Sequence, residues 1–360
     1  PRAGGQYVFL RESMGPLMGF LYGWTLFVVI QTGTIAAVAV AFGRFLGVLW
    51  PAITPDRYAW FPQADVCIKV LGCTDPSAAI QLGLTPQRLA GLVTVWLLTW
   101  VNLRGVREGK FVQTTLTVVK TGALALLIIL GFTVGRNATA IAANFGAAFT
   151  AGPSWGTTFI LAAGAAMVGS LFSSDAWNNV TFAAAEVQNP RRNLPLALVL
   201  GTGLVSVLYV LANVSYLQVL PMNGAADGAT AIARGIAHAT QDRVATAATE
   251  QMFGAAGATA MAIAILISTF GCNNGLILAG ARVYFAMARD KLFFRRAGTL
   301  NGRHVPAFAL VVQSIWVSLL CLSGTYGQLL NYVIFAALIF YALTTIGLFR
   351  LRTLRPDAER

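Results

Sequence analysis

Eight long runs of apolar residues alternate with polar segments along the chain. They cover residues 17–49, 88–104, 111–134, 157–187, 196–220, 256–289, 306–324 and 328–349. About 20 apolar residues in a helix cross the hydrocarbon of a bilayer, and a helix satisfies its own backbone hydrogen bonds there, which an open strand does not. The pattern therefore predicts an all-α integral membrane protein with eight transmembrane helices. The first, fourth and sixth runs exceed one crossing, so we expect those helices to be tilted, broken or protruding.

The composition supports a membrane protein. Hydrophobic residues make up 57% of the chain and charged residues only 11%, and the mean hydropathy is +0.69. Soluble domains carry about a quarter charged residues, so a single transmembrane domain over residues 1–360, in contact with the lipid bilayer, fits better than several soluble domains. The net charge of +12 would suit a nucleic-acid partner. However, the basic residues lie in short loops without an RNA-type motif beside them, so we predict no nucleic-acid partner.

The basic residues predict which side is cytoplasmic, because short cytoplasmic loops are rich in Lys and Arg. Sixteen of the 25 fall in the N-terminal segment, in alternate loops and in the C-terminal tail: Arg2, Arg11, Arg104, Arg107, Lys110, Arg191, Arg192, Arg289, Lys291, Arg295, Arg296, Arg303, Arg350, Arg352, Arg355 and Arg360. We therefore expect a multi-pass protein of the plasma membrane with both ends of this chain cytoplasmic.

A polar cluster interrupts the fourth apolar run, where residues 172–179 read F-S-S-D-A-W-N-N. An ionised carboxylate near mid-membrane costs at least about 2.5 kcal/mol, so Asp175 should face protein, water or a cation. Short side chains such as those of Ser173 and Ser174 compete with helical hydrogen bonding. We expect the helix to break here, to line a cavity with free backbone groups, and to begin its second half near Ala176. The alternative is a polar cluster satisfied by neighbouring helices, with no ligand.

Lys120 is the second ionisable residue inside an apolar run. It lies ten residues beyond Lys110, about 15 Å deeper along a helix, whereas a lysine stem reaches only about 6 Å, so it should point into the bundle. Three roles stay open for it: a fixed positive charge where another transporter binds a cation, a proton carrier, or a structural ion pair, with Asp175 as the candidate partner.

Other chemistry is absent or weak in the sequence. There is no G-x-S-x-G, H-E-x-x-H or P-loop, and neither histidine has a partner at metal-ligand spacing, so we predict no enzyme activity, no cofactor and no metal. Cys67 and Cys73 share a polar loop and could pair if it is extracytoplasmic. No cysteine position indicates an intermolecular disulfide, and the sequence identifies no accessory subunit. Asn331, at the start of the last run, taken alone suggests an interhelical hydrogen bond.

Five stretches resemble the amino acid, polyamine and organocation (APC) superfamily, and within it the L-type amino acid transporter-like branch. They run in the family's order along the chain and read P-R-A-G-G-Q-Y-V-F-L-R-E-S-M-G-P, V-V-K-T-G-A-L, L-F-S-S-D-A-W-N-N-V-T-F-A-A-A-E-V-Q-N-P-R-R-N-L-P, S-T-F-G-C-N-N-G-L-I-L-A-G-A-R-V-Y-F-A-M-A-R-D and L-L-N-Y-V-I-F-A-A-L-I-F-Y-A-L-T.

The resemblance implies a leucine-transporter-type bundle of two inverted repeats. On that alignment the chain holds helices 3 to 10 of 12, with the remainder of the first repeat in residues 1–134 and the second repeat in residues 157–350. The substrate-binding residues that it implies are Phe172, which closes over the substrate, the unwound turn Ser173, Ser174, Asp175 and Ala176, and Asn331. Lys120 matches a lysine that stands in for sodium.

Two departures from the family pattern stand out. Ser174 replaces a frequent aromatic residue and should enlarge the pocket, while Ala176 replaces a glycine and limits backbone freedom. The glycine-rich break of helix 1 is absent from the chain, so we expect the chain alone not to transport.

The resemblance implies secondary active transport of L-amino acids by alternating access, with sodium-independent exchange of neutral amino acids as the leading prediction. The alternatives are proton-coupled uptake of amino acids or polyamines, and a membrane sensor without turnover.

Overall fold

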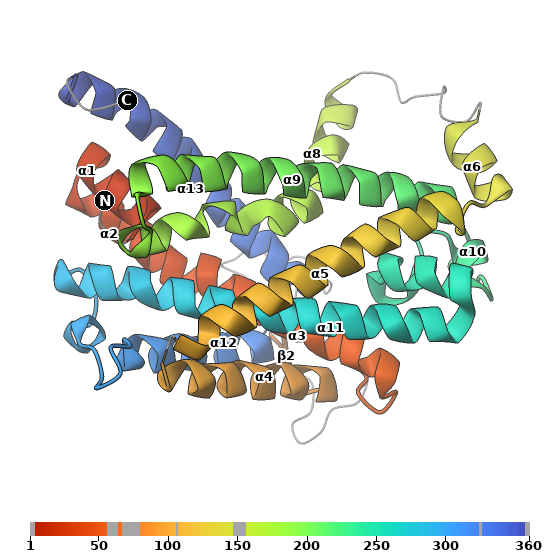
Figure 1. Cartoon of the computed structure of the whole chain (residues 1–360), viewed down its shortest axis with the longest axis horizontal. Helices are drawn as coiled ribbons and strands as arrows, with labels where there is room; N and C mark the ends of the chain where they lie inside the picture. Colours follow the sequence, from red (N-terminus) through yellow and green to blue (C-terminus); the bar gives the residue numbers. More distant parts are fainter. Residues whose placement is uncertain are drawn as a thin grey trace.

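The computed structural model describes residues 4–55, 64–66, 80–105, 107–146, 156–323 and 326–356. Helices dominate it (Figure 1). The α-helices are α1 Gln6–Met14, α2 Pro16–Thr25, α3 Gln31–Leu49, α4 Pro86–Leu103, α5 Arg107–Thr133, α6 Ala138–Phe145, α8 Thr157–Ser174, α9 Pro190–Val219, α10 Ala231–Arg234, α11 Val244–Arg289, α12 Ala307–Ser323 and α13 Tyr326–Leu354. A π-helical turn, Leu26–Ile30, joins α2 to α3, and 3₁₀ segments cover Asp175–Glu186, Thr240–Asp242 and Arg295–Gly298. Strands β1 Ala64–Val66 and β2 Ile80–Leu82 form an antiparallel pair.

Each of the eight apolar runs is helical in the structure. Six spans within the described residues are long and apolar enough to cross a membrane: Pro16–Leu49, Thr114–Thr133, Thr157–Phe182, Pro190–Val219, Val244–Arg289 and Tyr326–Leu354. Helix α12 has only 17 residues, and α4 is not among the six. The helical membrane architecture is therefore confirmed, whereas the count of eight crossings stays a prediction.

Helix α3 lies at the centre of the bundle, against α4, α11, α12 and α13. Aromatic rings fill the space beside the π-helical turn: the Phe27 ring centroid lies 5.2 Å from that of Tyr284 and 5.1 Å from that of Phe293. Glycines bring the helices together, since a Cβ on Gly23 would overlap Met287 and one on Gly43 would overlap the Gln87 carbonyl. The missing side chains of these glycines therefore allow close packing within the bundle.

Helices α8 and α9 lie on the outside of the bundle, and α5 packs between α9 and α11 (Figure 1). No residue of α8 is fully buried. The exposed residues of both helices are largely apolar, among them Ile160, Leu161, Val199 and Leu204. This outer face is suited to lipid.

Helix α11 is bent at Gly254, whose φ of 64° lies in the left-handed region that glycine tolerates. The expected start at residue 256 coincides with this bend, and the structure adds a helical segment before it.

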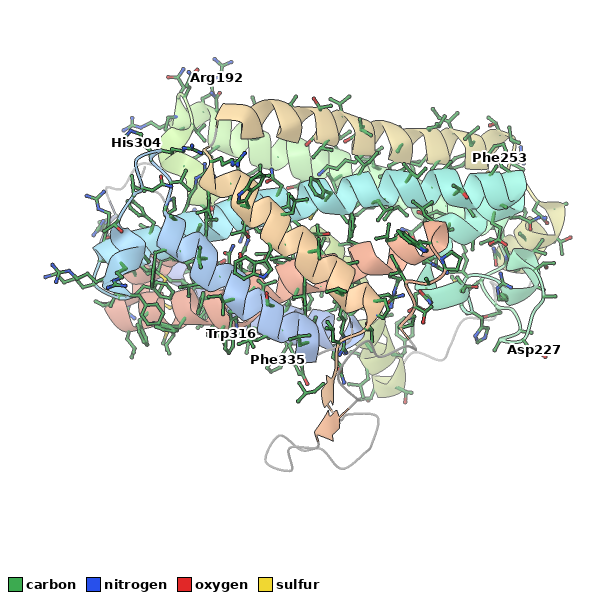
Figure 2. The ribbon with its side chains drawn as sticks, turned by 90° about the horizontal axis from the view of Figure 1, so that it is seen from below. Arg192, Asp227, Phe253, His304, Trp316 and Phe335 are labelled. Atoms are coloured by element: carbon green, nitrogen blue, oxygen red, sulfur yellow. The ribbon has the colours of Figure 1, made fainter. Side chains whose placement is uncertain are left out.

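Figure 2 shows Arg192 and His304 at one end of the molecule and Asp227 and Phe253 at the other. Both chain termini lie at one end in Figure 1. Their cytoplasmic placement stays a prediction.

Candidate functional site

The polar cluster lies where α8 changes into a 3₁₀ helix. The α-helix ends at Ser174, and the next twelve residues, Asp175–Glu186, are 3₁₀. The hydroxyls of Ser173 and Ser174 donate to the Ser170 carbonyl at 2.8 and 3.0 Å, and the Asp175 N–H donates to the Phe172 carbonyl. The serines thus compete for backbone carbonyls as expected.

The expected unwound turn is instead a change of helix type. Ser174 and Asp175 keep helical backbone angles, with φ −104° and ψ −2° at the first and φ −59° and ψ −36° at the second. A 3₁₀ run of more than three or four residues is uncommon, and such a stretch inside a helix often marks a hinge. The α-helix therefore ends where the sequence places the break, but the chain continues directly as a 3₁₀ helix. The expected free backbone groups are not seen at Ser173 and Asp175, because both carbonyls accept hydrogen bonds from neighbouring helices, as in the alternative of a satisfied polar cluster.

Asp175, the first residue of the 3₁₀ segment, is held by Tyr341 on α13. The Tyr341 hydroxyl lies 2.8 Å from Asp175 Oδ1 and 3.0 Å from the Asp175 carbonyl oxygen. A second tyrosine, Tyr209 on α9, donates to the Ser173 carbonyl at 3.2 Å. Two neighbouring helices therefore hold the junction, and its carboxylate occupies the positive end of the 3₁₀ segment.

Asp175 and Tyr341 lie between two cavities. The smaller cavity, about 20 Å³, has room for about one water, and its polar lining residues include Gln6, Asn178 and Asn179. The larger cavity, about 190 Å³, is bounded by α8, the start of the 3₁₀ segment and the Ile334–Leu338 face of α13. A carboxylate shared by two adjoining spaces is well placed to contact a small polar ligand.

Helix α1 joins the 3₁₀ segment to α13. The Gly4 N–H donates to the Phe182 carbonyl at 3.2 Å. Gln6 donates to the Phe340 carbonyl at 3.1 Å and to Thr344 Oγ1 at 2.6 Å, and it accepts from Asn178 Nδ2 at 3.2 Å.

A cluster of charges fixes the other end of α1. Arg11 pairs with Asp290 after α11, Tyr7 donates to Asp290 at 2.9 Å, and Arg355 after α13 contacts Glu12 at 3.0 Å. Burial, and then the Asp290 carboxylate, raise the pKa of Tyr7 to about 12. Hydrogen bonds from Arg11 and Arg355 lower the pKa of Glu12. The cluster ties three helix ends together outside the membrane spans.

Lys120 lies apart from Asp175, on the side of α5 that faces α11. Leu116, one turn earlier, packs against Gly271 on α11, and Cys272 lies within electrostatic range of the Lys120 ammonium. Lys120 is half-buried and makes no hydrogen bond or ion pair with residues that the structure describes. The alternative of an ion pair with Asp175 is therefore not supported.

The other expected site residues are only partly brought together. Phe172 is half-buried, with its ring centroid 6.1 Å from that of Tyr326. Ser173, Ser174 and Ala176 are exposed. Asn331 is also exposed and lies outside both cavities, one turn before Ile334 on α13. Its substrate role stays a prediction.

The sequence did not single out Tyr341, Gln6 or Asn178 as site residues. A tyrosine inside an apolar run needs a polar partner, and this signal could have identified Tyr341. Gln6 and Asn178 meet only through the tertiary fold.

The described residues contain no group of three or more His, Cys, Asp or Glu side chains placed to hold a metal. Cys272 and Cys321 are free thiols. Cys67 and Cys73 lie outside the described residues, so their pairing stays a prediction.

Comparison with known proteins gives a consistent result. A model of the amino acid permease family matches residues 1–360. The chain is 28% identical to the b(0,+)-type amino acid transporter 1 of Rattus norvegicus, 28% identical to the serine/threonine exchanger SteT of Bacillus subtilis (strain 168), and 30% identical to the large neutral amino acids transporter small subunit 2 of Homo sapiens. All of this chain is aligned in each case, against 64%, 71% and 59% of these relatives. The chain thus spans less than two thirds of the rat transporter.

Proposed function

Because the chain belongs to the amino acid permease family, we propose that the complete protein carries L-amino acids across the plasma membrane by alternating access. Residues 1–134 and 157–350 would belong to the two inverted repeats, with eight crossings and both ends of the chain cytoplasmic. The relatives named above for amino acid transport support this proposal.

The observation that carries the proposal is the junction at Asp175. It combines a change of helix type inside a membrane span with a carboxylate that borders two cavities. We assign the substrate ammonium to this carboxylate and to nearby backbone oxygens, because both attract a cation. Phe172 would close over the substrate, and the small exposed side chains of Ser173, Ser174 and Ala176 would leave room for it. Asn331 would contact it only after α13 moves.

We further propose sodium-independent exchange of neutral amino acids. Lys120 supplies a positive charge without a partner among the described residues, which suits a fixed replacement for a bound cation. The name of the serine/threonine exchanger supports exchange and a neutral substrate. The same lysine also favours a second candidate, proton-coupled uptake of amino acids or polyamines, because its ammonium has no acidic partner among the described residues.

Counterflow in proteoliposomes tests the proposal with the complete protein. Labelled serine or leucine should enter vesicles preloaded with unlabelled amino acid, at the same rate in sodium and in choline. The Lys120→Ala variant should slow exchange without changing its pH profile, whereas loss of the pH dependence would favour proton coupling. Binding of labelled amino acid without any flux would refute transport and favour a sensor.

A further inference from the structure

A separate polar cavity lies at the opposite end of the molecule from the loops that carry Arg192 and His304. It is formed where α10, the segment Thr240–Asp242 and the start of α11 meet the end of α3, close to Phe253 in Figure 2. Its volume is about 340 Å³, and its polar lining includes Arg234, Arg243, Thr246 and Glu250. None of these residues borders the cavities at Asp175.

A buried hydroxyl without a partner is the first sign of a ligand. Thr246 is only 6% exposed, and its Oγ1 has no hydrogen-bond partner in the described part of the chain. Thr249, one turn later on the same helix, donates instead to the Ala245 carbonyl at 3.0 Å. Leaving a buried polar group unpaired is unfavourable, so a polar ligand in the cavity would relieve this cost.

Two guanidinium groups line the same cavity and are held in place by backbone carbonyls. Arg234 donates through Nη1 to the Gly228 carbonyl at 3.0 Å, while its buried Nε is unpaired within the described residues. Arg243 donates through Nε to the Thr240 carbonyl at 3.2 Å and through Nη1 to the Arg44 carbonyl at 3.3 Å. Burial, and then the nearby Arg44, lower the pKa of Arg243, although Glu250 opposes this shift. Arg44 itself is paired with Asp242 at 3.7 Å. The lining holds two arginines and one glutamate, so positive charge is in excess and an anion would be stabilised.

The bend in α11 adds a helix start to the same wall. The helix resumes after Gly254, and Ala255 and Ala258 of its first turn line the cavity. The start of a helix carries partial positive charge and favours an anionic group. Together with the guanidinium groups and the Thr246 hydroxyl, it forms a surface for a carboxylate.

We propose that this cavity is a second amino acid site, distinct from the site at Asp175, at the extracytoplasmic mouth of the transporter. The carboxylate of the ligand lies between Arg234, Arg243 and Thr246. Glu250 lies on the same wall and takes the ammonium, which distinguishes an amino acid from a simple anion. The volume is near the lower limit of small-molecule sites, about 300–1,000 Å³, and suits a small ligand. This assignment rests on the proposed function, since an amino acid is the expected substrate.

Protection of an engineered cysteine tests the site without relying on transport. Ala255→Cys in the complete protein places a thiol on the exposed rim of the cavity, where a membrane-impermeant thiol reagent added outside should modify it. The protein without this substitution measures labelling of the native cysteines. Serine should slow modification in a saturable manner, and acetate should be much weaker because it lacks the ammonium.

Two threonine variants separate binding from folding. Thr246→Val removes the unpaired hydroxyl and should raise the protecting concentration of serine about tenfold, the effect of losing one hydrogen bond to a charged group. Thr249→Val removes a hydroxyl from the same helix, away from the cavity. It should leave the protecting concentration of serine unchanged.

The labelling results test the second site independently of transport. Protection by serine that is weakened by Thr246→Val and not by Thr249→Val supports the site. No protection, equal protection by serine and acetate, or equal weakening by both variants would each overturn it. Absence of counterflow in the unmodified protein, in contrast, would refute only the transport proposal.

Discussion

Replacing Tyr341 with Phe removes a single oxygen atom, the one that holds the junction between α8 and the 3₁₀ segment. That hydroxyl lies 2.8 Å from Asp175 Oδ1 and 3.0 Å from the Asp175 carbonyl oxygen. Its one proton is shared between these two acceptors. The variant leaves the ring in place, beside Trp177 at a centroid distance of 6.2 Å, so only the hydrogen bond is lost.

The size of the effect follows from the type of bond. A hydrogen bond to a charged group contributes about 1.5–3 kcal/mol net, and 1.4 kcal/mol corresponds to about tenfold. If the bond orients the Asp175 carboxylate toward the substrate, the kcat/KM of exchange should fall about tenfold to a hundredfold. Because the site is only partly buried, we expect the fall in kcat/KM to be near the lower end of this range.

The assay is initial-rate counterflow of labelled serine or leucine in proteoliposomes. Tyr332→Phe is the matched control, because Tyr332 lies on the same helix, is 57% exposed and makes no hydrogen bond with the described residues. It should keep at least about half of the activity, since surface changes away from such contacts have small effects. Thermal stability of both variants shows whether folding accounts for any loss.

Equal kcat/KM values for the Tyr341→Phe variant and the unmodified protein would refute the role assigned to the junction. A fall in kcat/KM that is matched by Tyr332→Phe would do the same, because the loss would then not depend on Asp175.

Three further predictions concern stability. Asn102→Ala removes the buried hydrogen bond of 3.0 Å to Asn274 between α4 and α11 and should lower the free energy of unfolding by about 1–3 kcal/mol, measured by thermal denaturation in detergent against an exposed Asn193→Ala variant. Gly280→Ala places a Cβ against Gln313 and the Gln31 side chain and should cost about 1–3 kcal/mol through overpacking; an unchanged melting temperature would contradict the packing seen here. The pKa of Glu12 lies below its ordinary value of 4.5 because its two arginine partners favour the carboxylate. The stabilisation that ionised Glu12 gives the folded protein should therefore be present above about pH 4.5 and be lost as the pH falls through the lowered pKa. The difference in melting temperature between the unmodified protein and the Glu12→Gln variant should accordingly shrink between about pH 5 and 3.

The sequence predicts the membrane helices well because each carries its own signal. Apolar runs longer than the hydrocarbon thickness leave few alternatives to a helix. Serine side chains beside Asp175 likewise predicted the end of α8 through local hydrogen bonding. In both cases the information lies within a few residues of the element that it determines.

The sequence does not predict which distant residues meet. Asp175 and Tyr341 are 166 positions apart, and their contact depends on how α8 and α13 pack. The form of the break was missed for a related reason. Long 3₁₀ segments are uncommon, and this one is held by distant residues, among them Tyr341 on α13, which donates to the Asp175 carbonyl. The early start of α11 was missed because a single glycine divides a run that remains helical on both sides.

The hydrogen bonds of α1 have a consequence for motion. Gly4, just before this short helix, donates to the 3₁₀ segment, and Gln6 in its first turn bonds to both Asn178 and the carbonyl of Phe340. Its far end is anchored by charge to the residues that directly follow α11 and α13. If the 3₁₀ segment tilts, as the proposed alternating access would require, α1 should move with it and the Arg11–Asp290 pair should be strained. A change beside Asp175 would then reach the charged residues that follow α11 and α13.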